Sequence, residues 1–335
     1  MTERRTTEPQ ISDPQTPEPH TPAPLPFPDP LPPKPQPQKT IKRLRHPVWT
    51  ENKAKLIELY LYKFVMVTKH GTYIDGFAGP QNPNDDSMWS AKLVLESEPR
   101  WLKFFYLFDI LDEQVARLDA LKEEQPERDS KGRKIYRTIT VKGGDFNETI
   151  HGLLKLRSIK PTEATFCLLD QRSTECHWST VQALAEYKAD SPHKIELFYF
   201  LAVGWLGRTM AATTQNTQDL DDWWRGPGWR ELKGKNCWEL SEIVAERFRS
   251  ELNYKTAMAW PIFEREGGGK VMYFMIHATD HDEAPALMYR SYDQVHQPKE
   301  PLPNDLFEWR LPPAATVQKK LKRIVEAAKR EDDNC

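Results

Sequence analysis

The sequence predicts an α/β fold in which a mostly parallel sheet is covered by helices on both faces. Three observations support this prediction. Short apolar runs alternate with helix-like segments between about residues 50 and 203, a glycine-rich turn follows the first run, and aspartates follow the first four. Such alternation is typical of parallel sheets, because each connection between parallel strands needs a crossover helix.

Residues 1–40 are dominated by Pro, Thr, Glu and Gln. Prolines at this density remove backbone donors and prevent a packed core, so we expect an extended, disordered tail. A solvated leader is the simpler interpretation, and a ligand for a proline-binding module is the alternative. One folded domain is expected at residues 41–300, followed by a linker and a basic amphipathic helix at 301–335.

The elements of the folded part follow from apolar spacing and turn residues. A first helix is expected at 50–67, with Thr50 as its cap. Strands are expected at 72–74, 104–108, 139–141, 165–169, 195–203, 256–263 and 271–278. Further helices are expected at 87–98, after Asp112 as a cap, at 150–156 and at 178–188. The glycines at 267–269 separate the last two strands and predict an antiparallel hairpin.

Composition limits the location and the partners of the chain. Its formal net charge is -2, so no global field directs it to nucleic acid or to an anionic membrane. Its four cysteines are scattered, which argues against a disulfide framework and against a metal site and suits the reducing cytoplasm. No segment approaches the roughly 18 apolar residues of a membrane span, so we expect no membrane contact.

A glycine-rich turn follows the first strand in the run Asp75-Gly76-Phe77-Ala78-Gly79. Small residues directly after a strand let the backbone approach a ligand closely, and a following helix N-terminus favours negative charge there. These five residues are therefore candidates for binding a cofactor.

Aspartates also close the next three predicted strands, at Asp109, Asp145 and Asp170. Ligands of open α/β sheets bind outside the carboxyl ends of the strands, so these side chains are expected to share one crevice with Asp75. Asp109 is placed to accept both hydroxyls of a ribose, and Asp145 to accept from an adenine amino group. The alternatives are a helix cap and an ordinary turn.

Several motifs together resemble a known family. They are the loop Tyr-Ile-Asp-Gly-Phe-Ala-Gly-Pro at 73–80, the Gly-Asp-Phe-Asn element at 144–147, the strand end at 169–170 and the closing strand at 273–279. Over about residues 42–294 the chain is similar to the three-Cys-motif partner proteins (TcmP) of bacteria and phages. The resemblance implies a class I methyltransferase-like Rossmann fold, S-adenosylmethionine as cofactor and a partner with a three-cysteine motif encoded nearby.

If the chain transfers a methyl group, residues at and after the end of the fourth strand are candidates for the chemistry. Asp170 is the candidate for orienting the methyl acceptor or taking its proton. His177 is a second candidate for proton transfer, with a structural role as its alternative. Cys176 is either a nucleophile or a buried thiol.

Two positions depart from the family pattern. Gln81 stands where a glycine is usual, and Gln171 and Arg172 follow Asp170 where the family commonly has Asp-Pro-Phe-Gly. Two functions therefore remain open. One is a methyltransferase acting on nucleic acid or on a partner protein, and the other is a catalytically inactive Rossmann-fold interaction protein.

Two further segments have alternative interpretations. The Trp-rich segment at 221–238 lies within a cap expected at about 210–250, and its interleaved arginines would also suit base stacking. The last helix, expected at 315–329, has a basic face that is either solvated or in contact with nucleic acid.

Overall fold

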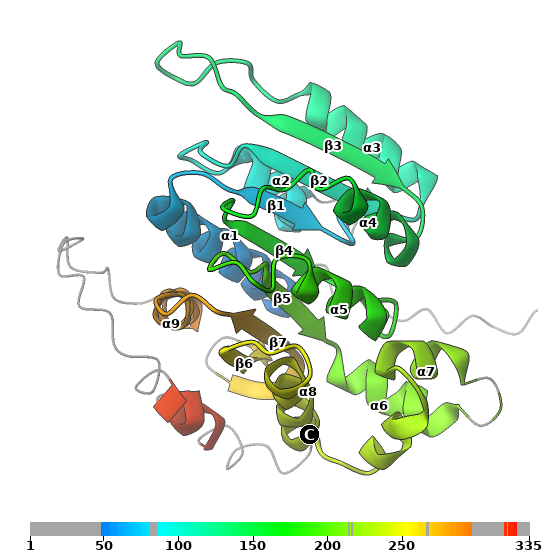
Figure 1. Ribbon diagram of the computed structural model, residues 1–335. Coiled ribbons are helices and arrows are strands. Elements are labelled where there is room, and N and C mark those ends of the chain that lie inside the picture. Colours follow the sequence, from blue (N-terminus) through cyan, green and yellow to red (C-terminus); the bar gives the residue numbers. More distant parts are fainter. Residues whose placement is uncertain are drawn as a thin grey trace, which may run out of the picture. The chain divides into compact units, whose positions relative to one another are not determined.

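In the part of the chain that the structure describes, seven strands form one sheet in the order β3-β2-β1-β4-β5-β7-β6 (Figure 1). The strands are β1 (Thr72–Asp75), β2 (Phe104–Asp109), β3 (Thr138–Gly143), β4 (Thr165–Leu169), β5 (Glu196–Leu201), β6 (Thr256–Arg265) and β7 (Gly268–Thr279). Strands β1 to β5 are parallel, and β7 is antiparallel to β5 and to β6. The predicted mostly parallel sheet with a C-terminal antiparallel hairpin is confirmed, and the fold is Rossmann-like.

The computed structural model describes residues 48–80, 86–213, 215, 217–265, 268–296, 318–319 and 321–326. The chain divides into residues 1–43 and 44–335, and all described residues belong to the second unit. The predicted N-terminal tail, Gln81 and Gly267 lie outside the described residues.

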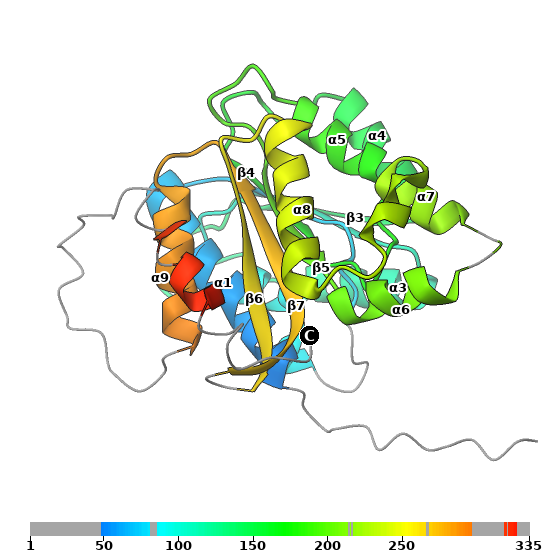
Figure 2. The ribbon, with the colours of Figure 1, turned by 90° about the horizontal axis from the view of Figure 1, so that it is seen from below.

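Helices cover both faces of the sheet. The first face carries α1 (Val48–Thr68), α2 (Ser90–Glu96), α3 (Asp112–Glu123) and α9 (Ala284–His296). The second carries α4 (Phe146–Lys155), α5 (Trp178–Glu186), α6 (Val203–Ala212), α7 (Gln218–Trp224) and α8 (Cys237–Ser250). Figure 2 shows α1 and α9 on one side of the β6–β7 hairpin and α8 on the other. Short 3-10 turns η1 (Asp86–Met88) and η2 (Pro227–Leu232) complete the fold.

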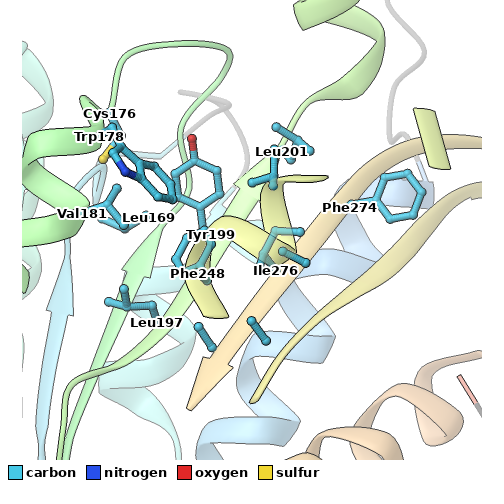
Figure 3. Close-up of a cluster of buried hydrophobic side chains, with 14 of the residues drawn as sticks. Leu169, Cys176, Trp178, Val181, Leu197, Tyr199, Leu201, Phe248, Phe274 and Ile276 are labelled. Carbon is cyan, nitrogen blue, oxygen red and sulfur yellow. The ribbon is translucent and has the colours of Figure 1, made fainter. Parts of the chain in front are cut away.

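The core of the second face is built on aromatic rings from three elements. Trp178 of α5, Tyr199 of β5 and Phe248 of α8 gather there (Figure 3). The ring of Phe248 lies 5.2 Å from that of Trp178 and 5.5 Å from that of Tyr199, both edge to face, the arrangement that ring quadrupoles favour. Trp223 of α7 donates its indole N–H to the Tyr199 hydroxyl at 2.6 Å. The Trp-rich segment is therefore anchored on the sheet through β5.

Several predicted helix ends are wrong. Helix α1 begins at Val48, so Thr50 lies inside it and does not cap it. Leu111, not Asp112, occupies the cap position of α3. Helix α4 begins earlier than predicted because Asp145 caps it, accepting the backbone N–H of Asn147 at 2.8 Å.

The predicted helix at 87–98 is divided into η1 and α2, and α6, α7, α8 and α9 were not predicted as helices. Helix α8 carries a local start signal that sequence reasoning missed, a capping box in which the Asn236 side chain accepts the Glu239 N–H and the Glu239 side chain accepts the Asn236 N–H. The scattered cysteines argued against a disulfide framework; Cys167 and Cys176 are free thiols, but Cys237 at the start of α8 is disulfide-bonded.

The last helix is amphipathic over its described part, residues 318–319 and 321–326. Leu321 is buried with the core of the first face, whereas Lys319, Lys322 and Arg323 are exposed. The basic face of this helix is therefore turned to solvent. Among the described residues, no helix has the length and apolar character that crossing a membrane requires.

Candidate functional site

The glycine-rich loop after β1 is tied to neighbouring elements at the carboxyl edge of the sheet. The backbone N–H of Gly76 donates to the Leu168 carbonyl of β4 at 3.0 Å, and that of Ala78 donates to the Phe108 carbonyl of β2 at 2.7 Å. The indole N–H of Trp89 donates to the Ala78 carbonyl at 2.6 Å. The loop therefore spans the point between β1 and β4 where strand order reverses, the usual ligand position in open α/β sheets.

Two glycines in this loop are required by close packing. A Cβ on Gly79 would lie 2.7 Å from Cβ of Gln114 and would overlap the Asp109 carboxylate. A Cβ on Gly76 would lie 2.9 Å from the ring of Phe146. Real Cβ atoms do not approach neighbours this closely, so the loop packs against β2, α3 and α4 only because these side chains are absent.

Asp109 at the end of β2 receives two backbone donors. Its Oδ2 accepts the N–H of Gly79 at 2.9 Å, and its Oδ1 accepts that of Leu111 at 3.0 Å. The amide of Gln114 on α3 is buried beside Gly79, and its Oε1 has no hydrogen-bond partner among the described residues. A buried acceptor without a partner is costly, so this place is suited to a ligand that brings a donor.

Asp75 at the end of β1 is 1% exposed. It accepts the hydroxyl of Tyr73 at 2.8 Å and the N–H of Phe77 at 3.1 Å. Burial raises the pKa of the Asp75 carboxyl to about 7, and the negative charges of Asp170 and Asp109 act in the same direction against its two hydrogen bonds. Asp75 can therefore exchange a proton near neutral pH.

Asp170 after β4 forms a buried ion pair that sequence reasoning missed. Nζ of Lys53 on α1 lies 2.9 Å from Oδ1 and 2.8 Å from Oδ2 of Asp170, and the two side chains are 6% and 9% exposed. The Lys53 ammonium also lies 5.1 Å from the ring centre of Phe200 and 5.5 Å from that of Tyr273. The available signal was the position of Lys53, three and four residues before the buried Leu56 and Ile57 on one helix face.

Five of the predicted site residues line one small cavity: Asp75, Phe77, Ala78, Gly79 and Asp170. Lys53 and residues 88–90 are the other described residues that line it, and its volume is about 10 Å³. This volume holds about one water molecule, so binding of a larger ligand requires the surrounding wall to move.

The remaining predicted residues form a second cluster near α4 and α5. Asn147 connects them: it donates to Oδ1 of Asp145 at 2.9 Å, and its Oδ1 accepts the backbone N–H of His177 at 2.9 Å. Neither Asp145 nor His177 lines the cavity beside Asp75. Cys176 is fully buried, and burial raises the pKa of its thiol well above the usual range, which argues for a structural thiol.

A larger cavity, of about 290 Å³, opens at the opposite edge of the sheet and contains none of the predicted residues. Its buried carboxylate, Glu196, accepts from the Tyr60 hydroxyl and from Thr279 Oγ1 at 3.1 Å, and lies 3.0 Å from Nε2 of His277. These partners satisfy the carboxylate within the fold. Within the described residues, no group of three or more His, Cys, Asp or Glu side chains is arranged to hold a metal ion.

The fold and the acidic crevice define a Rossmann-like α/β protein with a candidate ligand site at the carboxyl edge of its sheet. Compared with protein-family models and with curated proteins, the chain matches none.

Proposed function

We propose that the chain is an S-adenosylmethionine-dependent methyltransferase of the class I, TcmP type. It would act in the cytoplasm on nucleic acid or on a three-Cys-motif partner protein. The observation that supports this proposal best is the convergence of Asp75, Asp109 and Asp170 on the loop that ends at Gly79. Acidic side chains at successive strand ends, next to a closely approaching backbone, suit a ligand with ribose hydroxyls and an ammonium group.

The residues present fit this cofactor by their donor and acceptor chemistry. Asp109 would accept ribose hydroxyls, and the unpartnered Oε1 of Gln114 offers a further acceptor beside Gly79. Asp75 would lie near the ammonium of the methionine part, where a positive charge favours its ionised form. Asp145, which lies apart from the cavity, stays a prediction for the adenine end.

Methyl transfer depends mainly on alignment of the acceptor with the methyl carbon that the cofactor supplies. The chain contributes to that alignment through the Lys53–Asp170 pair, which holds the Asp170 carboxylate beside the cavity. Asp170 would orient the acceptor from this position. His177 would accept or donate a proton only if the methyl acceptor reaches the region between α4 and α5.

The same ion pair also favours the alternative, a catalytically inactive interaction protein. Both carboxylate oxygens of Asp170 contact the Lys53 ammonium, and the cavity of about 10 Å³ is small. In this alternative the Lys53–Asp170 pair occupies the place of a ligand and stabilises the fold, and the protein catalyses no reaction.

Calorimetry with S-adenosylmethionine tests the proposal. The wild-type protein is expected to bind, and Asp109→Asn to bind at least about tenfold more weakly, because hydrogen bonds to a charged acceptor contribute about 1.5–3 kcal/mol. Asp119→Asn is the matched control, since Asp119 is exposed on α3, and it is expected to bind like the wild type.

Absence of binding at millimolar cofactor by a folded wild-type protein would sink the methyltransferase proposal. Methyl incorporation into DNA, RNA and the partner protein, compared between wild type and Asp170→Asn, then separates turnover from binding alone. Binding without incorporation into any of the three acceptors would favour the inactive alternative.

A further inference from the structure

A second surface at the carboxyl edge of the sheet has a chemistry of its own. A cavity of about 250 Å³ lies between α6, the start of α8 and the first residues of β7. Among the residues that the structure describes, the charged side chains that line it are Arg208, Lys235 and Lys270, and none is acidic. We propose that this cavity binds the phosphodiester backbone of single-stranded nucleic acid, which would be the methyl acceptor. This inference rests on the proposed function and names its substrate class.

The cavity and the acidic site lie at the same edge of the sheet. Strand β5 ends at Leu201, which pairs with Phe274 of the antiparallel β7. Lys270 precedes Phe274 by four residues, so it lies beyond the carboxyl end of β5. Tyr273, close to Lys270 in the same strand, contacts the ammonium of Lys53 in the acidic site. The cavity lies on the face of α6 and α8 and Lys53 comes from α1 on the other face, so a bound single strand would reach Asp170 by passing over the carboxyl end of β5.

The three cations are available to an anionic ligand. Each is exposed, and none forms an ion pair with another residue that the structure describes. The chain as a whole has a net charge of only -2, so three cations around one cavity are a local concentration of positive charge. A cluster of cations binds nucleic acid favourably because it releases the counterions that are condensed on the phosphate backbone.

An aromatic side chain beside the cavity indicates a single strand. Trp205 of α6 is 57% exposed, and the guanidinium of Arg208 lies 4.6 Å from its ring centre. Single-stranded sites combine a basic groove with exposed aromatic rings on which unpaired bases stack, whereas the bases of a duplex are not available for such stacking. Trp223 and Trp229, by contrast, are buried, and the Arg247 guanidinium lies over the ring of half-buried Trp224 at 3.9 Å, so these three rings of the Trp-rich segment are not free for stacking.

Two glycines keep the α6 surface open next to these side chains. A Cβ on Gly207 would meet nothing within 4 Å, and one on Gly204 would meet only the Arg208 guanidinium at 3.8 Å. Glycine disfavours a helix relative to alanine, and no described contact requires it at these positions. Close approach of a nucleic-acid backbone supplies a reason for both.

Fluorescence anisotropy tests the inference, with a labelled oligothymidylate or oligouridylate of about 12 nucleotides, within the site sizes known for single strands. The full-length protein is used without S-adenosylmethionine, so failure of cofactor binding leaves this result readable. Wild type is expected to bind. The variant Arg208→Ala, Lys235→Ala, Lys270→Ala is expected to lose at least about tenfold in affinity and about 2 in the salt slope, since each neutralised phosphate contributes about 0.7.

The matched control replaces three exposed lysines elsewhere, Lys131, Lys155 and Lys160, with alanine, and is expected to bind like the wild type. Trp205→Ala should weaken binding, whereas Trp101→Ala should not, although Trp101 is also exposed and lies under the Lys69 ammonium. Thermal melting verifies that every variant is folded.

Three results would overturn the inference: no binding by the wild type, equal losses in the test and control variants, or stronger binding of a matching duplex or an acidic peptide than of the single strand. If the wild type binds S-adenosylmethionine but no oligonucleotide, this inference is rejected and the proposed function still stands.

Discussion

Two buried charges at the carboxyl edge illustrate how neighbours determine the chemistry of a carboxylate. Asp170 is accompanied by the Lys53 ammonium, whereas Asp75 has only neutral hydrogen-bond donors, Tyr73 and the Phe77 N–H. Desolvation of Asp75 is therefore not balanced by a positive charge, and its pKa rises to about 7. Removing Lys53 would leave the buried Asp170 carboxylate without this ion pair. Removal of one partner of a buried pair destabilises the folded state strongly, because the other charge stays desolvated.

The raised pKa of Asp75 predicts how stability depends on pH. Its unfolded pKa is about 4, so the folded protein binds the proton more tightly, and this contribution is fully present below about pH 4 and is lost as pH rises to about 7. In the limit the loss is about 4 kcal/mol, from the shift of about three pKa units. Urea denaturation of wild type and Asp75→Asn at several pH values measures it. The wild type should lose stability relative to the variant as pH rises, and parallel curves would contradict the prediction.

In the glycine-rich loop, the residue types in the sequence directly determine the geometry of the candidate site. It is short, and its backbone donates to β2 and β4 while its glycines lie against α3 and α4. A loop fixed at both ends positions Asp75 and Asp109 without depending on long side chains. This arrangement explains why a run of small residues follows β1.

Replacing a glycine with alanine should have opposite effects on stability in this loop and in an ordinary helix. Gly79→Ala is expected to cost about 1–3 kcal/mol, because the new methyl group would overlap Asp109 and Gln114. Gly152→Ala is the control: Gly152 lies inside α4, where a Cβ meets nothing within 4 Å, and alanine should stabilise the helix by about 1 kcal/mol. Unfolding free energies from denaturant titration give both values, and equal effects of the two changes would refute the packing argument.

At the scale of the whole molecule, the order of the strands decides where a ligand can bind. Strand β1 lies inside the sheet, with β2 on one side and β4 on the other, so the ends of β1, β2 and β4 meet at one edge. The antiparallel β7 adds Lys270 to that edge from a distant part of the sequence. The acidic site and the basic cavity are therefore products of the topology.

The composition of residues 1–40 predicts that they do not contribute to this core. Brief trypsin treatment is expected to cut after Lys39, Lys42, Arg43 or Arg45 and to leave a folded fragment. N-terminal sequencing identifies the cut, and the melting temperature of the fragment should lie within about 2 °C of that of the full chain, as for removal of a segment without packed contacts. A much lower melting temperature would show that the tail stabilises the domain.

The sequence by itself determined the α/β class, the strands of the sheet, the antiparallel hairpin and the loop at Gly76 and Gly79. These features depend on local patterns, namely the alternation of apolar runs and the positions of glycines. Local patterns also placed Asp75, Asp109 and Asp170 at strand ends, and strand ends of parallel neighbours share an edge.

Only the tertiary structure decided which side chains meet. Lys53 reaches Asp170 across 117 residues, and Asp145 and His177 are connected by Asn147 away from the cavity beside Asp75. The sheet likewise decided where the apolar faces of α6, α8 and α9 pack, since helices of this length are stabilised mainly by burial of such a face. Charge pairing and burial depend on contacts distant in sequence, and those contacts exist only once the chain has folded.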